Sequence, residues 1–158
     1  MKTIKKLVLA CMLCLLSATA CKKPVKDTPA LVEGEWHLES VSSGILDNEE
    51  FPIDIYVAFS KSSFEIFQNL GGGHYAHFSG TFTSVGNVLS GTYSDGSQWA
   101  SRYEVTVEND VLTMTAMDAA DGETCTYSRC TIPDSVRKDA EDYSSDTKAS
   151  RMQFRRAL

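Results

Sequence analysis

Five cysteines are the residues of this 158-residue chain with the widest range of side-chain chemistry. Cys11 and Cys14 lie in a leading apolar run, Cys21 follows it, and Cys125 and Cys130 lie far downstream. The last two are five residues apart on one predicted strand, roughly 16 Å at the rise of an extended chain. Because a disulfide needs Cα atoms within about 7 Å, we expect two free buried thiols, and a bridge only if a bulge breaks the strand.

Three histidines could ligate a metal. His74 and His77 have an odd spacing, which on a strand places them on opposite faces, and His37 lies on another predicted strand. No cysteine or carboxylate stands at a fixed spacing from them, as a zinc site would require. We therefore expect surface histidines, with no metal and no cofactor.

Catalytic motifs are missing from the sequence. It contains no G-x-S-x-G elbow, no P-loop and no G-x-G-x-x-G. Glu49 and Glu50 form a carboxylate pair in a long predicted connection, where solvent exposure is the simpler interpretation and a glycosidase pair the alternative. The sequence predicts a protein that is not an enzyme, and a hydrolase is the third function considered.

The first twenty residues have the pattern of an export signal that ends before Cys21. Lysines occupy positions 2, 5 and 6, and residues 7–16 are a ten-residue apolar run, too short for the ~20 residues that span a bilayer. Small residues fill positions 17–20 and resemble a lipobox, with Ala18 where a larger aliphatic residue is commoner. Residues 1–20 are thus predicted to be a lipoprotein signal peptide. A plain secretory signal cut after Ala20 is the alternative.

Lipidation of Cys21 would fix the mature protein to a membrane. Two or more acyl chains hold stably, whereas a single chain binds only marginally. Residues 21–30 are then a lipidated tether, short and polar, with lysines suited to lie beside anionic headgroups. This anchor predicts a location in the cell envelope, on the outer membrane and facing the periplasm or the cell surface.

Charge is concentrated in the body of the chain. Residues 31–132 contain fifteen Asp and Glu against three Lys and Arg, a formal charge of −12, while the flanks are slightly basic. Such a surface repels nucleic-acid phosphates, so nucleic acid is excluded as a partner.

Residues 31–132 alternate between apolar and polar side chains with a period of two. Eight such runs are separated by turn residues such as Asn109-Asp110 and Asp121-Gly122, as is typical of an all-β sandwich or barrel. Because the connections are mostly short, we predict an eight-stranded antiparallel up-and-down barrel. The longest connection, 42–52, is expected to fold over one open end. The eight runs are 35–39, 53–59, 64–69, 76–83, 89–93, 102–107, 112–116 and 123–131.

Two further features resemble the lipocalin fold. Gly34-Glu35-Trp36 matches the G-x-W of a first lipocalin strand, and Arg129 matches the arginine of the last strand. The stretch 86–96, Trp99 and the run 103–107 are similar to bacterial lipocalin-like lipoproteins. The resemblance implies closure of the barrel by Gly34, Trp36 and Arg129, with the guanidinium over the indole as a cation–π contact.

The interior of a barrel of this size either is filled by side chains or holds one small ligand. In the ligand interpretation, tyrosine hydroxyls with Arg102 or threonines near the rim would orient a small amphipathic molecule. In the other, aromatic side chains fill the barrel completely. The candidate interior or cavity residues are Trp36, Leu38, Ile55, Val57, Phe78, Phe82, Tyr93, Tyr103, Met114 and Tyr127.

After the barrel, residues 133–143 are predicted to form a short C-terminal helix. Pro133-Asp134 is a suitable start, and Ile132, Val136, Ala140 and Tyr143 form one apolar stripe that would dock on the barrel. Residues 144–158 are predicted to be disordered. Alternatively, the apolar residues Met152, Phe154 and Leu158 among arginines would touch a membrane or an acidic partner.

Two functions remain open from the sequence. The first is a lipid-anchored, non-catalytic envelope protein that binds a small amphipathic or hydrophobic molecule. The second is a structural or assembly module whose filled barrel acts through protein–protein contacts. Apart from the membrane reached through Cys21, protein partners are not readable from the residues.

Overall fold

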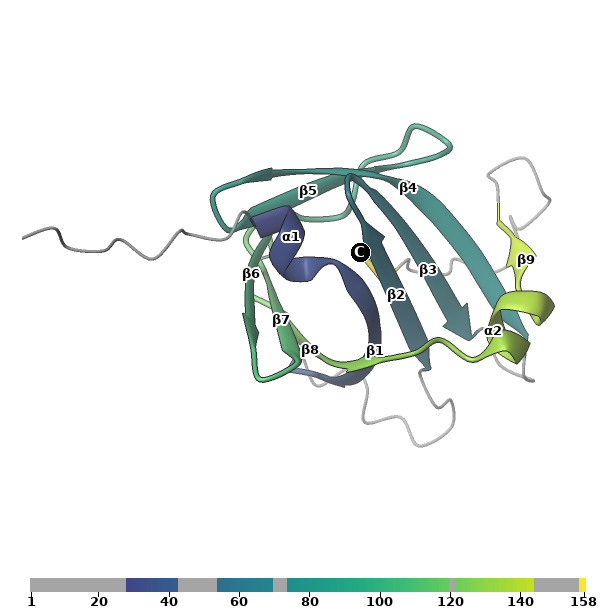
Figure 1. Ribbon diagram of the computed structural model, residues 1–158. Coiled ribbons are helices and arrows are strands. Elements are labelled where there is room, and N and C mark those ends of the chain that lie inside the picture. Colours follow the sequence, from purple (N-terminus) through teal and green to yellow (C-terminus); the bar gives the residue numbers. More distant parts are fainter. Residues whose placement is uncertain (1–27, 43–53, 70–73, 120–121, 144–156) are drawn as a thin grey trace, which may run out of the picture.

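The computed structural model describes residues 28–42, 54–69, 74–119, 122–143 and 157–158 (Figure 1). One sheet of nine strands contains more than half of these residues, and two short helices accompany it. The elements in chain order are α1 (Thr28–Val32), β1 (Gly34–Val41), β2 (Ile55–Ser60), β3 (Ser63–Asn69), β4 (Tyr75–Val85), β5 (Val88–Tyr93), β6 (Tyr103–Glu108), β7 (Val111–Ala116), β8 (Thr124–Cys130), α2 (Asp134–Asp139) and β9 (Glu141–Asp142).

The first eight strands form a closed antiparallel barrel. Each strand pairs with the next along the chain, from β1 to β8. The last, β8, pairs back with β1, so that Trp36 lies opposite Arg129. This closure leaves no free edge between the first and last strands. The predicted eight-stranded up-and-down barrel is confirmed.

The alternating sequence pattern is realised as an apolar inside and a polar outside. In β2, for example, Ile55, Val57 and Phe59 are buried while Tyr56 and Ala58 are half-buried on the outer wall. Hydrophobic burial of one face in this way fixes the register, because a slip by one residue would turn every apolar side chain outward. The β6–β7 hairpin turns at Asn109 and Asp110, both with positive φ, as a tight two-residue turn requires.

The barrel wall has few interstrand pairs between β5 and β6. Strands β5 and β6 pair only at Val88–Glu104 and Leu89–Tyr103. The connection between them, residues 94–102, folds back on β5, where Trp99 donates its backbone N–H to the carbonyl of Gly91 at 2.9 Å. This connection places the indole of Trp99 in the core.

The C-terminal helix is shorter than predicted. It is confined to Asp134–Asp139, after which Ala140 is extended and Glu141–Asp142 forms β9, parallel to the first residues of β4. Val136 and Ile132 are buried against Phe67 on the outer wall of β3. The prediction that Tyr143 continues the same stripe is wrong, because Tyr143 instead packs against the barrel core.

The outward burial of Phe67 explains why the pattern of β3 was irregular in the sequence. Phe64 and Ile66 face the barrel interior, whereas Phe67 lies under α2. This strand is apolar on both faces because it separates two clusters.

The N-terminal boundary also differs from the prediction. Residues 28–30, assigned to the polar tether, belong to α1, which lies ahead of the first strand and contacts β4. The signal 1–20, the remaining tether, the connection with Glu49 and Glu50, and tail residues 144–156 lie outside the described residues. Among the residues that are described, no helix is long and apolar enough to cross a membrane.

Candidate functional site

One end of the barrel is closed around Trp36, whose side chain is fully buried. Its indole N–H donates to the carbonyl of Val32 in α1 at 2.8 Å. Arg129 covers the ring, with its guanidinium carbon 4.2 Å from the ring centroid. The same guanidinium donates to the carbonyl of Glu33 at 3.1 Å and to the Asp110 carboxylate at 2.7 Å. These contacts tie α1, β1, β8 and the β6–β7 turn together.

Gly34 is required at this end for two reasons. Its φ of +133° is a conformation that side-chain-bearing residues rarely adopt. In addition, a Cβ at this position would lie 2.3 Å from a guanidinium nitrogen of Arg129. The spacing Gly34-x-Trp36 therefore lets the arginine reach the indole.

The ten candidate interior residues all belong to one buried cluster inside the barrel. Aromatic rings meet edge to face there, as in the pairs Phe59–Phe82 with ring centroids 5.3 Å apart and Phe78–Tyr93 at 6.2 Å. This geometry suits the quadrupoles of the rings.

The candidate residues leave out three aromatic members of this cluster, Phe59, Phe64 and Trp99. Phe64 contacts both Tyr93, at 5.4 Å between centroids, and Trp99, at 5.1 Å. The indole of Trp99 lies directly on Gly91, where an added Cβ would come within 2.2 Å of the ring. A glycine at an inward position of a strand was the available signal, because it marks the close approach of another group.

The most unexpected member of the cluster is Leu158. Only 1% of its surface is exposed, and its carbonyl oxygen accepts a hydrogen bond from the hydroxyl of Tyr93 at 2.7 Å. Figure 1 shows this end of the chain within the ring of strands. The prediction that the tail through Leu158 is disordered, or that Leu158 touches a membrane or partner, is wrong for this residue. Ala157 packs beside it.

Tyr127 is the most deeply buried tyrosine of the interior set. Burial raises the pKa of its hydroxyl well above the ordinary value, and the neighbouring Cys125 adds to the effect. Tyr127 therefore stays neutral and acts as an apolar wall with one polar atom. Cys125 and Cys130 form no disulfide, as predicted, although Cys130 is half-buried on the outer wall rather than buried.

Arg102 does not take part in the interior. It is exposed and donates from its guanidinium to both carboxylate oxygens of Asp118, at 2.8 and 3.1 Å. This pairing, with the backbone N–H of Arg102, lowers the pKa of Asp118 to about 2. The expectation that Arg102 orients a ligand has no support in this arrangement.

A polar cluster occupies the outer wall of β1, β2 and β4. Asp54 accepts a hydrogen bond from the hydroxyl of Tyr75 and lies 2.8 Å from His37 Nε2. The His37 ring stacks on Tyr56 with centroids 4.6 Å apart. Burial, followed by the hydrogen bond to Asp54, raises the pKa of Tyr75. These side chains satisfy one another on the barrel surface.

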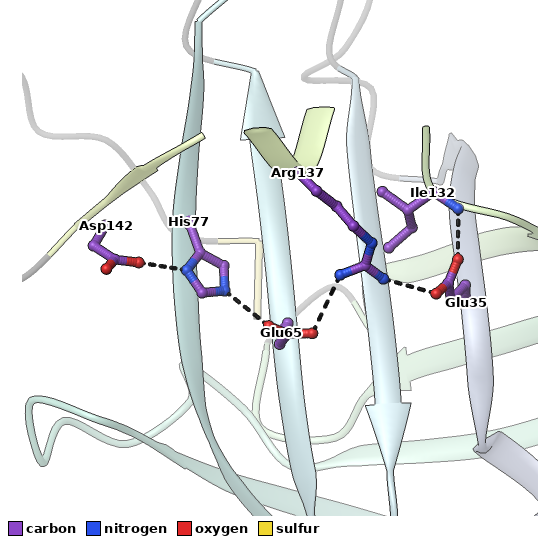
Figure 2. A network of polar contacts seen from close by, with 6 residues as sticks. All are labelled: Glu35, Glu65, His77, Ile132, Arg137 and Asp142. Carbon is purple, nitrogen blue, oxygen red and sulfur yellow. Dashed lines mark hydrogen bonds and ion pairs between the residues drawn. The ribbon is translucent and has the colours of Figure 1, made fainter. Parts of the chain in front are cut away.

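A second outer network holds the C-terminal segment against the wall (Figure 2). Arg137 of α2 pairs with Glu35 at 2.7 Å and with Glu65 at 3.5 Å. His77 lies between Glu65, 3.3 Å from its Nε2, and Asp142 of β9, 2.6 Å from its Nδ1. Glu35 also accepts the backbone N–H of Ile132. His77 is thus engaged on the outer wall, and His74 lies exposed just before β4.

In the part of the chain that the structure describes, no group of three or more His, Cys, Asp or Glu could hold a metal ion. Within that part, the barrel interior around Tyr93 is one region where apolar walls and a placed polar group converge, as in small-molecule sites. No family model matches the chain, and a search of curated proteins found no match.

Proposed function

We propose that this chain is a lipid-anchored, lipocalin-like envelope protein that binds a small amphipathic or hydrophobic molecule inside its barrel without catalysis. The observation that carries the proposal is the place of Leu158. An apolar side chain and one acceptor oxygen, from outside the eight strands, occupy the barrel interior against Tyr93. A small amphipathic molecule has the same two features.

The chemistry of the surrounding wall supports this proposal. Phe64 and Phe78 flank Tyr93 edge to face and supply apolar surface. The Tyr93 hydroxyl supplies a single buried donor, which is costly to leave unpaired and so favours a ligand with an acceptor. The remaining interior residues act as packed walls around this position.

The proposed location depends on Cys21. An acylated Cys21 would keep the barrel beside a bilayer, where amphipathic molecules are concentrated. The Gly34, Trp36 and Arg129 arrangement supports the lipocalin-like part of the proposal, since a glycine, an indole and a guanidinium close the barrel as that resemblance implies.

A structural or assembly module is the second candidate, and one observation favours it. Inside the barrel, side chains such as Leu112 and Met114 are completely buried and belong to one packed cluster. A barrel filled along its whole length would act through its outer surface alone.

Native mass spectrometry of the full chain, extracted gently from membranes, separates the two candidates. Ligand binding predicts a retained small molecule in addition to the mass of the acyl anchor. Tyr93→Phe should lower the retained fraction several-fold, whereas Tyr56→Phe, the same change on the outer wall, should not. A parent protein that carries only its acyl groups, and binds no amphipathic probe when titrated, would favour the structural module.

A further inference from the structure

Three buried side chains of the described barrel cluster come from outside the eight strands: Val32, Trp99 and Leu158. Val32 lies two residues before β1, and the backbone of Trp99 is bonded to Gly91. Val32 and Trp99 are therefore held in place by their connection to the adjacent strands β1 and β5. Leu158 lies fifteen positions after Tyr143 in the sequence, and its hydrogen bond to Tyr93 is made through its own carbonyl.

The C-terminal segment reaches the same aromatic group at a second point. Tyr143 donates its backbone N–H to the carbonyl of His77 at 2.9 Å, and its ring lies 5.3 Å from that of Phe78. Phe78 in turn contacts Tyr93. Tyr143, Phe78, Tyr93 and Leu158 thus form one continuous group, in which two members belong to the barrel wall and two to the segment after it.

The wall near this group has few interstrand bonds. The first residues of β4, from Tyr75 to Ser79, pair with β3 on one side, but β5 pairs with β4 only from Gly80 onward. The other edge of these residues carries β9 instead. Strand β5 is also paired with β6 at only two positions. Local opening here would break the two β4–β9 pairs and the bonds between β5 and residues 97–99 rather than a long interstrand ladder.

We infer that Ala157–Leu158 is a tethered occupant of the ligand site, and that the ligand displaces it from Tyr93. This inference rests on the proposed function. The ligand class is a small molecule with a short branched aliphatic group and one acceptor oxygen of a carbonyl or carboxylate group. It matches the leucine side chain and carbonyl that now fill the position.

Tethering sets how strongly the occupant competes. Because Leu158 and Tyr93 belong to one chain, the competition is intramolecular and depends on an effective concentration rather than on the protein concentration. A ligand can bind only the fraction of molecules in which the position is vacant, so its apparent affinity falls by that fraction. The C-terminal residues would then keep the interior covered until the ligand is abundant.

The test uses the full chain carrying Cys21→Ser, so that no acyl chain of the protein's own anchor enters the assay. The probes are 4-methylpentanamide and 4-methylpentanoate, which share the leucine side chain and offer the acceptor oxygen as a neutral amide or as a carboxylate. Calorimetric titration compares this parent with Leu158→Ala and Leu158→Asp. We expect the apparent Kd to fall at least tenfold in both variants. The control Val85→Ala, at a side chain 82% exposed, should bind as the parent does.

A second readout follows the tail itself. In protein labelled with ¹³C-methyl leucine, the Leu158 methyl resonances should be shifted by the adjacent aromatic rings and should move to random-coil positions as a probe that binds is added. Near-ultraviolet circular dichroism and melting curves establish that every variant is folded.

Each contrary result has its own meaning. Equal affinity of parent and both variants would overturn the tethered occupant and leave ligand binding intact. Random-coil Leu158 resonances in the free parent would do the same. Absence of binding by every folded protein would overturn both this inference and the proposed function.

Discussion

Arg129 lies over Trp36 with its guanidinium carbon 4.2 Å from the indole centroid, and the two residues are directly opposite each other on β8 and β1. The contact joins the first and last strands, so it is formed only when the barrel is closed. It also shields the indole, whose N–H is bonded to α1. This pair therefore couples strand closure to the cover at one end of the barrel.

Replacement of Arg129 tests that coupling. Arg129→Ala removes the cation–π contact and leaves the carbonyl of Glu33 without its donor. We expect a loss of about 0.5 to 2 kcal/mol in the free energy of unfolding, set mainly by the contact with the indole, because water can reach the exposed carbonyl of Glu33. Urea unfolding followed by tryptophan emission in a Trp99→Phe background reports on Trp36 alone.

The matched control is Arg102→Ala, which removes an arginine paired with a carboxylate at the exposed surface. It should cost clearly less, because exposed ion pairs contribute little. An unchanged urea midpoint and emission maximum in Arg129→Ala would contradict a structural role for the Arg129–Trp36 contact.

Gly34→Ala should destabilise the barrel through both backbone and contact. The φ of +133° alone costs about 1 to 3 kcal/mol for a residue with a Cβ, and that Cβ would displace Arg129. Gly96→Ala is the control, since Gly96 also has positive φ but nothing within 4 Å of an added Cβ. Urea midpoints should fall further for Gly34→Ala than for Gly96→Ala. Equal losses would mean that the approach of Arg129 is unimportant.

The barrel was predictable because its information is local and periodic. Alternation in each strand and turn residues such as Asn109-Asp110 specify both faces and the connections. Closure by Trp36 and Arg129 was predictable only through the resemblance to lipocalins, because neither residue indicates the other through spacing or periodicity. The end of α2 was not predictable. The apolar spacing of Ala140 and Tyr143 is compatible both with a longer helix and with a turn into β9.

The site around Tyr93 was predictable only in part. Tyr93 and Phe78 follow the strand pattern, whereas Trp99 lies in a connection without alternation. Leu158 is one apolar residue after a polar stretch, and no periodicity links it to the barrel. Its position is set by a long-range contact with the Tyr93 hydroxyl, which leaves no trace in the spacing of nearby residues.

Asp118 provides a prediction about pH. Its carboxyl has a pKa of about 2, below the usual 3.8, chiefly because the Arg102 side chain donates to it. Since the folded pKa is lowered, the stabilisation is present above pH 3.8 and is lost as the pH falls through about 2. Carboxyl ¹³C NMR should show this titration. Arg102→Ala should return the pKa part of the way, because the Arg102 backbone N–H still donates. An unaltered pKa in that variant would disprove the assigned cause.

Cys21→Ser tests the proposed anchor. Only the sulfur of Cys21 can form the thioether to the lipid. The Cys21→Ser protein should therefore be absent from the membrane fraction, while its barrel stays protease-resistant. All eight barrel strands begin after Val32, which explains why the fold should survive. Fractionation followed by limited proteolysis measures both properties. Continued membrane association in high salt would contradict lipid anchoring.

Arg137 joins α2 to the barrel through Glu35 and Glu65, and its guanidinium carbon lies 5.3 Å from the Phe67 ring centroid. Arg137→Ala should therefore release α2 and β9 without unfolding the barrel, because the contacts it removes all lie on the outer wall. Hydrogen exchange should accelerate several-fold at the Tyr143 amide, which is bonded to the His77 carbonyl.

Lys138→Ala is the control for that experiment. Lys138 is the next residue of the same helix but is exposed, so its removal changes helix composition and charge while leaving the network intact. Amides within β7 and β8 should exchange at parental rates in both variants. If Arg137→Ala and Lys138→Ala protect Tyr143 equally, β9 is held by its own backbone pairing with β4 rather than by the charged network. If the β7 and β8 amides also accelerate, the outer network stabilises the whole barrel and α2 is part of its folding unit.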